Sequence, residues 1–154
     1  MPSFPPNLQG VIDQLELQQL PITYANAIDT MNFEALDDVF TPDAYIDYRA
    51  FGGPDGKYPA IKKFLQDSLP NFPHFMHLVG NVAIKIDGDT ATGRTACYNP
   101  MVCKLADGSQ QIMYIGLWYH DKYVRTPKGW RFIERVEERC YVDNAPEGLS
   151  TSSN

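Results

Sequence analysis

Apolar residues recur at helical spacing between residues 20 and 40, and this stretch predicts two helices joined by a sharp turn. Tyr24, Ile28 and Met31 are three or four residues apart, which places them along one face of the first helix. Asp29 is next to that apolar stripe in the sequence. Because an unpaired buried carboxylate is costly, Asp29 must find a partner or stand at the mouth of a cavity.

The bounds of the helices follow from capping and proline signals. The first helix is expected to begin near Gln14 and to kink or break at Pro21, because the proline ring removes a backbone donor and clashes with the preceding turn. Asn32 can cap the second helix. A third helix, AIKKFLQDSL, is closed by Pro70. The helices are therefore expected to precede most of the strands.

Strand patterns dominate the rest of the chain. The segment AYIDYRAF has the β-branched and aromatic bias of a first strand, and residues 52–56 form a turn-prone loop. After Pro70, four strand-like runs are separated by turn sequences at 87–89, 107–108 and 127–129. This order predicts an α+β fold, in which about three N-terminal helices wrap a curved antiparallel or mixed sheet and leave a pocket.

The length of 154 residues and the hydrophobic content of 44% suit one domain with a sizeable core. We expect this domain over residues 11–143, with loose ends at 1–10 and 144–154. The sequence has no apolar run of about 18 residues and no signal-peptide pattern, which predicts a cytoplasmic protein without a membrane segment.

The formal net charge of -6 disfavours nucleic acid as a partner, because binding its backbone requires a concentrated basic surface. Cys97, Cys103 and Cys140 are odd in number and lack CxxC spacing. They are interpreted as reduced core thiols, with a catalytic cysteine as the alternative.

The histidines offer the clearest candidate chemistry. His74 and His77 bracket the entry to the second strand, and His120 stands near a turn, where a solvated ionic pair is expected. If Asp29 meets His77, the carboxylate would fix the ring tautomer and leave the other nitrogen free as a general base. One alternative is that His77 is a hydrogen-bonded histidine with no catalytic role. Another is a metal site formed by His74 and His77, which would need a third ligand.

His77 has the opposite strand parity to the apolar residues that follow it, which predicts a bulge near Gly80. Tyr24 and Tyr48 could donate hydrogen bonds to an oxygen that gains charge, although each alone is more often a packing residue. Arg135 on the last strand could hold a substrate oxygen or form a structural salt bridge with Asp29 or a glutamate.

Several segments together carry a family resemblance: YANAID, FEALDDVF, AYIDYRAFGGP, MHLVGN and GWRFIER. From about Gln14 to Val142, the chain resembles SnoaL-like members of the nuclear transport factor 2-like superfamily. This cone-shaped α+β fold includes scytalone dehydratase, bile-acid 7α-dehydratase, hexachlorocyclohexane dehydrochlorinase and ketosteroid isomerase. The resemblance places the Asp–His dyad of the dehydratases and the dehydrochlorinase on Asp29 and His77.

The resemblance also matches Tyr24, Tyr48 and Arg135 to the bile-acid dehydratase pattern. Where scytalone dehydratase has a tyrosine and a second histidine, this chain has Ile28 and Met101, which argues against scytalone itself as the substrate. Ketosteroid isomerase has a proton-shuttling carboxylate where this chain has Tyr48, which argues against that mechanism.

The resulting expectation is a lyase without cofactor or metal, in which His77 removes a proton from a small apolar, ring-like, polyketide-like or steroid-like substrate. The residues expected to bind this substrate are Arg135, Phe51, Phe72, Met101 and Trp118. A homodimer or homotrimer is expected. The alternatives are a non-catalytic binding or assembly module of the same fold, and the small subunit of a ring-hydroxylating dioxygenase.

Overall fold

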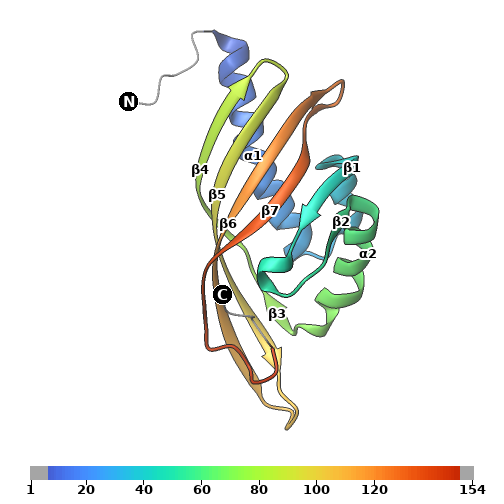
Figure 1. Cartoon of the computed structure of the whole chain (residues 1–154), viewed down its shortest axis with the longest axis vertical. Helices are drawn as coiled ribbons and strands as arrows, with labels where there is room; N and C mark the ends of the chain where they lie inside the picture. The colour runs from blue at the N-terminus through green and yellow to red at the C-terminus, as the bar shows by residue number, and fades with distance from the viewer. Residues whose placement is uncertain (1–6, 150–154) are drawn as a thin grey trace.

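The computed structural model describes residues 7–149, in which helices cover one face of a curved mixed sheet (Figure 1). Residues 1–6 and 150–154, parts of the expected loose ends, lie outside the described residues. The helical segments are α1 (Leu8–Asp29), η1 (Phe33–Asp38), η2 (Arg49–Phe51), α2 (Tyr58–Ser68) and η3 (Leu69–Asn71). The strands are β1 (Phe40–Asp47), β2 (Asp55–Lys57), β3 (His74–Phe75), β4 (Leu78–Asp87), β5 (Thr90–Lys104), β6 (Gln110–Thr126) and β7 (Gly129–Asp143).

The first helix differs from its expected bounds. It begins at Leu8 because the side chain of Asn7 accepts a hydrogen bond from the backbone N–H of Gly10 at 2.8 Å. It also continues through Pro21, so the expected break there is wrong. Proline inside a helix costs about 3 kcal/mol. The burial of apolar side chains before and after Pro21 offsets this cost, because each contributes about 1.5–3 kcal/mol. These buried residues are Leu17, Leu20, Tyr24 and Ile28.

The short elements after α1 also depart from expectation. The second helix is the 3-10 segment η1, and the Asn32 side chain makes no capping hydrogen bond to it. β1 ends at Asp47, and residues 49–51 form η2 instead of extending the strand. Part of the expected loop forms β2, because Gly52, with a φ of 79°, helps to reverse the chain so that β2 pairs antiparallel with β1.

The sheet follows the order β2-β1-β7-β6-β5-β3, with β4 also paired to β5. β1 runs parallel to β7, and the other pairs are antiparallel. The pairing of β4 with β5 shifts register between Val79 and Val82, which confirms the bulge expected near Gly80. This irregularity places Val79 and Val82 on the inner side of the strand together.

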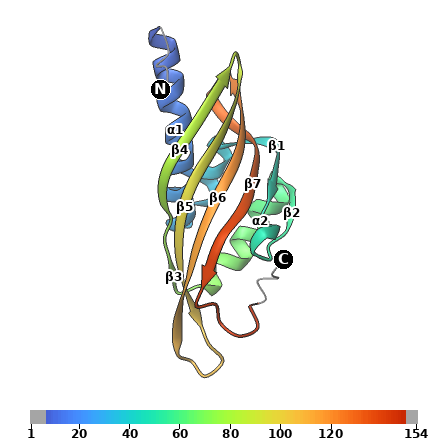
Figure 2. The same ribbon diagram turned by 60° about the vertical axis from the view of Figure 1, so that its left-hand side comes forward.

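Both long helices pack on the inner side of the sheet, α1 against β4 and β7 and α2 against β1 (Figure 2). The expected α+β class and the four long C-terminal strands are therefore confirmed.

Cys97 and Cys103 are buried, whereas Cys140 is exposed, so the expectation of a core thiol is wrong for Cys140. Cys140 borders a depression on the outer sheet surface, away from the helices. None of the described helices is both long and apolar enough to cross a membrane.

Candidate active site

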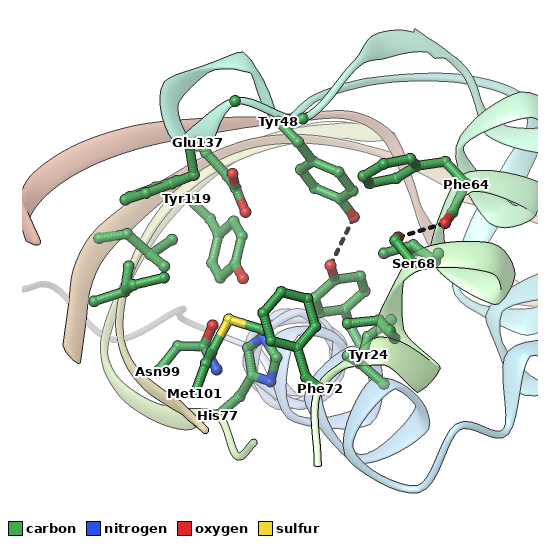
Figure 3. Close-up of a pocket in the computed structure, with 18 residues that line it drawn as sticks. Tyr24, Tyr48, Phe64, Ser68, Phe72, His77, Asn99, Met101, Tyr119 and Glu137 are labelled. Carbon is green, nitrogen blue, oxygen red and sulfur yellow. Dashed lines mark hydrogen bonds between the residues drawn. The ribbon is translucent and has the colours of Figure 1, made fainter. Parts of the chain in front are cut away.

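A cavity of about 250 Å³ opens between the inner face of the sheet and the helices (Figure 3). Its walls come from α1, η2, α2, the segment before β4, and strands β5, β6 and β7. Most of the lining is apolar and includes Phe51, Phe72 and Met101, three of the residues expected to bind substrate. The polar side chains among the lining residues are Tyr24, Tyr48, Ser68, His77, Asn99, Tyr119 and Glu137. An apolar cavity with a few converging polar groups is typical of a small-molecule site.

His77 lines this cavity, and its side chain meets that of Asp29, which is not itself a lining residue. The Nδ1–H of His77 donates to Oδ1 of Asp29 at 2.6 Å, and the backbone N–H of His77 donates to Oδ2 at 2.8 Å. The His77 side chain is 7% exposed and that of Asp29 is 25% exposed. Because a carboxylate only accepts hydrogen bonds, this contact requires a proton on Nδ1, so in the neutral ring Nε2 is the free nitrogen.

Asn99 on β5 holds in place the segment that carries His77. Its Nδ2–H donates to the backbone carbonyl of Met76 at 2.7 Å, which fixes the chain directly before His77. Asn99 is itself buried and lines the cavity. It was missed from the sequence, because a single amide within a long strand has no motif that points to a distant backbone segment.

Tyr24 and Tyr48 form a hydrogen-bonded pair, with their hydroxyl oxygens 2.7 Å apart (Figure 3). Burial raises the pKa of Tyr24 to about 12 and that of Tyr48 well above its ordinary value. Both phenols are therefore neutral at pH 7. One hydroxyl proton bridges the pair, so the other can be donated to an oxygen atom in the cavity.

The position of Tyr48 depends on a glycine in the loop that follows it. A Cβ atom on Gly53 would lie 2.8 Å from Cβ of Tyr48, closer than two such atoms can approach. Gly53 therefore allows this loop to fold against Tyr48 and form part of the cavity wall.

Glu137 on β7 also lines the cavity and was missed from the sequence. Among the described residues, its carboxyl group has no hydrogen-bond partner in the protein. Burial raises its pKa from 4.5 to about 8, against the opposing charge of Arg135, and the negative charge of Asp47 adds to the rise. At neutral pH this carboxyl group is therefore mainly protonated.

A bulge in β7 explains why Glu137 was missed. The pairing of β6 with β7 shifts between Lys122 and Tyr123, which leaves Ile133 without a partner on β6. Strict alternation from Phe132 would turn Arg135 and Glu137 away from the core. The extra residue reverses the parity and brings both side chains to the inner side.

Glu137→Gln is expected to stabilise the protein more at about pH 9 than at about pH 5.5. Because the folded-state pKa of Glu137 is raised from 4.5 to about 8, the folded wild type loses stability as pH rises through that window. The neutral glutamine avoids this loss, which we expect to be about 1–3 kcal/mol after allowance for solvent screening. Urea unfolding at both pH values measures it.

The matched control for this prediction is Glu138→Gln. Glu138 is the neighbouring glutamate, but it is exposed and pairs with His120 on the outer surface, as expected for a solvated ionic pair. An equal gain for Glu137→Gln at both pH values would contradict the raised pKa.

Two residues expected to bind substrate do not line the cavity. The guanidinium of Arg135 donates from Nε and Nη2 to both carboxylate oxygens of Asp121, at 2.8 Å each, and both residues are buried. Arg135 thus forms the salt bridge that was one of its two expected roles, with a partner the sequence did not indicate. Trp118 lies on the outer sheet surface beneath the guanidinium of Arg94, because its neighbours on β6, Leu117 and Tyr119, take the inward positions.

The remaining histidine, His74, is exposed on β3. Within residues 7–149, no three His, Cys, Asp or Glu side chains come together as a set of metal ligands. Burial raises the pKa of the Cys97 thiol to about 12, so this cysteine is a poor nucleophile at neutral pH.

A curved mixed sheet wrapped by helices around a cavity defines an α+β domain of the nuclear transport factor 2-like kind. Residues 9–136 match the family model of the SnoaL-like domain. The chain therefore belongs to the SnoaL-like family, which confirms the resemblance found in the sequence.

The chain is 55% identical over 131 residues to an uncharacterised protein of Mycobacterium tuberculosis, covering 85% of this chain and 88% of that protein. Its fold matches a candidate aromatic ring hydroxylase from Novosphingobium aromaticivorans with a TM-score of 0.78 and 28% identity, over 91% of this chain and 98% of that one. It also matches a hexachlorocyclohexane dehydrochlorinase from Novosphingobium barchaimii with a TM-score of 0.76 and 19% identity, over 91% and 94% of the two chains. The last match reflects shared fold alone.

Proposed function

We propose that this protein is a cofactor-free lyase that catalyses a dehydratase-type elimination on a small apolar substrate containing a ring. The observation that carries the proposal is the contact between His77 and Asp29 at the cavity wall. The Nδ1–H of His77 is bound to Asp29 at 2.6 Å, so Nε2 is the nitrogen left to accept a proton. A general base held in one tautomer beside an apolar cavity suits the removal of a proton from carbon.

In the proposed reaction, Nε2 of His77 takes a proton from the carbon next to a carbonyl group. Asp29 stabilises the imidazolium that forms, and so does the negative end of the α1 dipole, because Asp29 is the last residue of that helix. The electron pair of the broken C–H bond forms the new double bond as the leaving group departs from the neighbouring carbon.

The tyrosine pair has a separate role in this proposal. When the proton leaves carbon, negative charge develops on the carbonyl oxygen. The hydroxyl proton of Tyr24 or Tyr48 that is not used between them can be donated to that oxygen. Because both phenols stay neutral, they stabilise the charge without giving up the proton.

The substrate class follows from the cavity. Its wall presents aromatic and aliphatic side chains, with the polar groups confined to a few positions. These features favour a compact ring compound with a carbonyl group and a leaving group. The hexachlorocyclohexane dehydrochlorinase of the same fold is, by its name, an eliminating enzyme that acts on a ring compound.

The test is a screen of purified wild type and His77→Ala against cyclic β-hydroxy ketones, hydroxy-steroids, polyketide-like ketols and halogenated ring compounds. Thermal shift identifies the compounds that bind, and mass spectrometry detects loss of water or of a hydrogen halide. We expect the wild type to convert at least one bound compound, and His77→Ala to bind it without converting it.

His120→Ala is the matched control, because His120 is exposed and paired with Glu138 on the outer surface. It is expected to behave as the wild type. If compounds bind the wild type and His77→Ala equally and none is altered, the cavity is only a binding site. The protein is then better interpreted as a non-catalytic binding or assembly module.

A further inference from the structure

We propose that Glu137 is a second catalytic residue of this site, the acid that gives a proton to the departing hydroxyl group. This inference rests on the proposed function and adds to it a separate group for the second proton transfer. It also narrows the substrate to a cyclic β-hydroxy ketone, because only a poor leaving group such as hydroxide needs to be protonated as it departs.

The first support is the place of Glu137 in the cavity. Its side chain comes from β7, whereas His77 comes from the segment before β4, and Figure 3 shows the two on opposite sides of the cavity. A substrate between them would offer its acidic C–H to one side and its hydroxyl group to the other. The tyrosine pair lies on a further side, where a carbonyl oxygen can reach it.

The second support is that no cation in the described structure pairs with this carboxyl group. The nearby guanidinium of Arg135 donates from two of its nitrogens to Asp121, which is fully buried with it. Glu137 therefore has neither a salt bridge nor a hydrogen bond within residues 7–149. An unpaired carboxyl group in an apolar wall keeps its proton, and a protonated carboxyl group is a hydrogen-bond donor.

Burial is what favours the protonated state, because the charge of Arg135 opposes it and only that of Asp47 supports it. Burial raises the pKa of Glu137 to about 8, so the acid is available at neutral pH and is lost as pH rises through that value. Lysozyme shows the same principle, in which an apolar pocket keeps one carboxyl group protonated for use as an acid. The titratable and charged groups that face Glu137 or share its cavity are Arg135, Asp47, Tyr24, Tyr48, Tyr119, Cys97 and His77.

His77 receives the proton from carbon, and the C–H electron pair becomes the second bond of the alkene. The C–O bond breaks with its electron pair on oxygen, and that oxygen takes the proton of Glu137 and leaves as water. His77 is then protonated and Glu137 is charged, and transfer of one proton from His77 to Glu137 through water restores both.

Two probes that differ in the leaving group test this assignment. 3-Hydroxycyclohexanone loses water and 3-acetoxycyclohexanone loses acetic acid, and both give the same cyclohexenone. The ultraviolet absorbance of this product gives the rate, from which the uncatalysed rate is subtracted. Glu137→Gln is expected to slow loss of water by about 100-fold or more and loss of acetate by no more than about twofold, because acetate departs without prior protonation. Glu138→Gln is the control, since it removes a neighbouring carboxylate that is exposed on the outer surface.

The pH profile gives a second measurement. In the wild type, loss of water is expected to fall as pH rises through about 8, and loss of acetate is expected to lack this fall. Equal slowing of both probes in Glu137→Gln, or slowing of neither, would overturn the inference. His77→Ala must slow both probes, and if it slows neither, the proposed function itself fails.

Carbon-13 NMR of labelled glutamate carboxyl groups tests the same point without turnover. One resonance, missing in Glu137→Gln, is expected to titrate near pH 8. If the missing resonance instead titrates near the ordinary value of 4.5, the group is charged at neutral pH and Glu137 is not the acid, whether or not either probe is converted.

Discussion

Asp29→Asn is expected to lower kcat for elimination by about 1,000-fold, with little change in stability or in ligand binding. The reason is the tautomer of His77. Asp29 accepts one hydrogen bond from the backbone N–H of His77 and one from its ring Nδ1–H. The amide oxygen of asparagine can satisfy the backbone donor, but its NH₂ group then faces Nδ1 and forces the ring proton onto Nε2. A ring protonated at Nε2 cannot act as the base.

The comparison with Asp29→Ala separates the tautomer from mere loss of a contact. Alanine leaves the ring free to adopt either tautomer, so Asp29→Asn should be at least as damaging as Asp29→Ala. Asp43→Asn is the control, because Asp43 is exposed on β1. kcat, KM and the thermal midpoint are measured for each variant. A rise in KM at unchanged kcat would show that Asp29 acts in binding and would contradict the proposed role.

Asp121→Ala is expected to destabilise the fold by about 3–5 kcal/mol. Asp121 holds the guanidinium of Arg135 through two hydrogen bonds, and both side chains are fully buried. Removing the carboxylate leaves a buried positive charge without compensation. Nη1 of Arg135 already lacks a hydrogen-bond partner, and the bonds from Nε and Nη2 would be lost with Asp121.

Replacing both members of the pair is expected to recover most of that loss. Asp121→Leu with Arg135→Met removes both charges and fills a similar volume, which is often neutral or stabilising for a buried ion pair. Urea unfolding measures the free energy of each variant. Asp67→Ala, which removes the exposed pair with Lys63, serves as the control and should change stability little. If Asp121→Ala were no more harmful than Asp67→Ala, the pair would not stabilise the core.

The aromatic rings around Arg135 connect this pair to the cavity. The guanidinium carbon lies 4.3 Å from the ring centre of Tyr24 and 4.0 Å from that of Tyr119, both of which line the cavity. The salt bridge therefore supports the wall that carries the tyrosines, although Arg135 itself does not line the cavity.

The sequence by itself determined the fold class, the helix before Pro70 and the long C-terminal strands, because these depend on local periodicity and turn residues. It also indicated that Asp29 and His77 would meet, through the need of a carboxylate near the core for a partner and through the family resemblance. Tyr24 and Tyr48 were expected in the site as phenolic donors and through the family resemblance, whereas the hydrogen bond between them was not predicted.

Tertiary structure decided the features that depend on distant pairings. The parallel contact of β1 with β7 joins segments that are far apart in the sequence, and no local pattern specifies it. The partner of Arg135 proved to be Asp121, on the neighbouring strand. The bulge at Ile133 decided most for function, since one unpaired residue reverses the parity of β7 and brings Glu137 into the cavity. An apolar surrounding then keeps this carboxyl group protonated, and only the folded chain creates that surrounding.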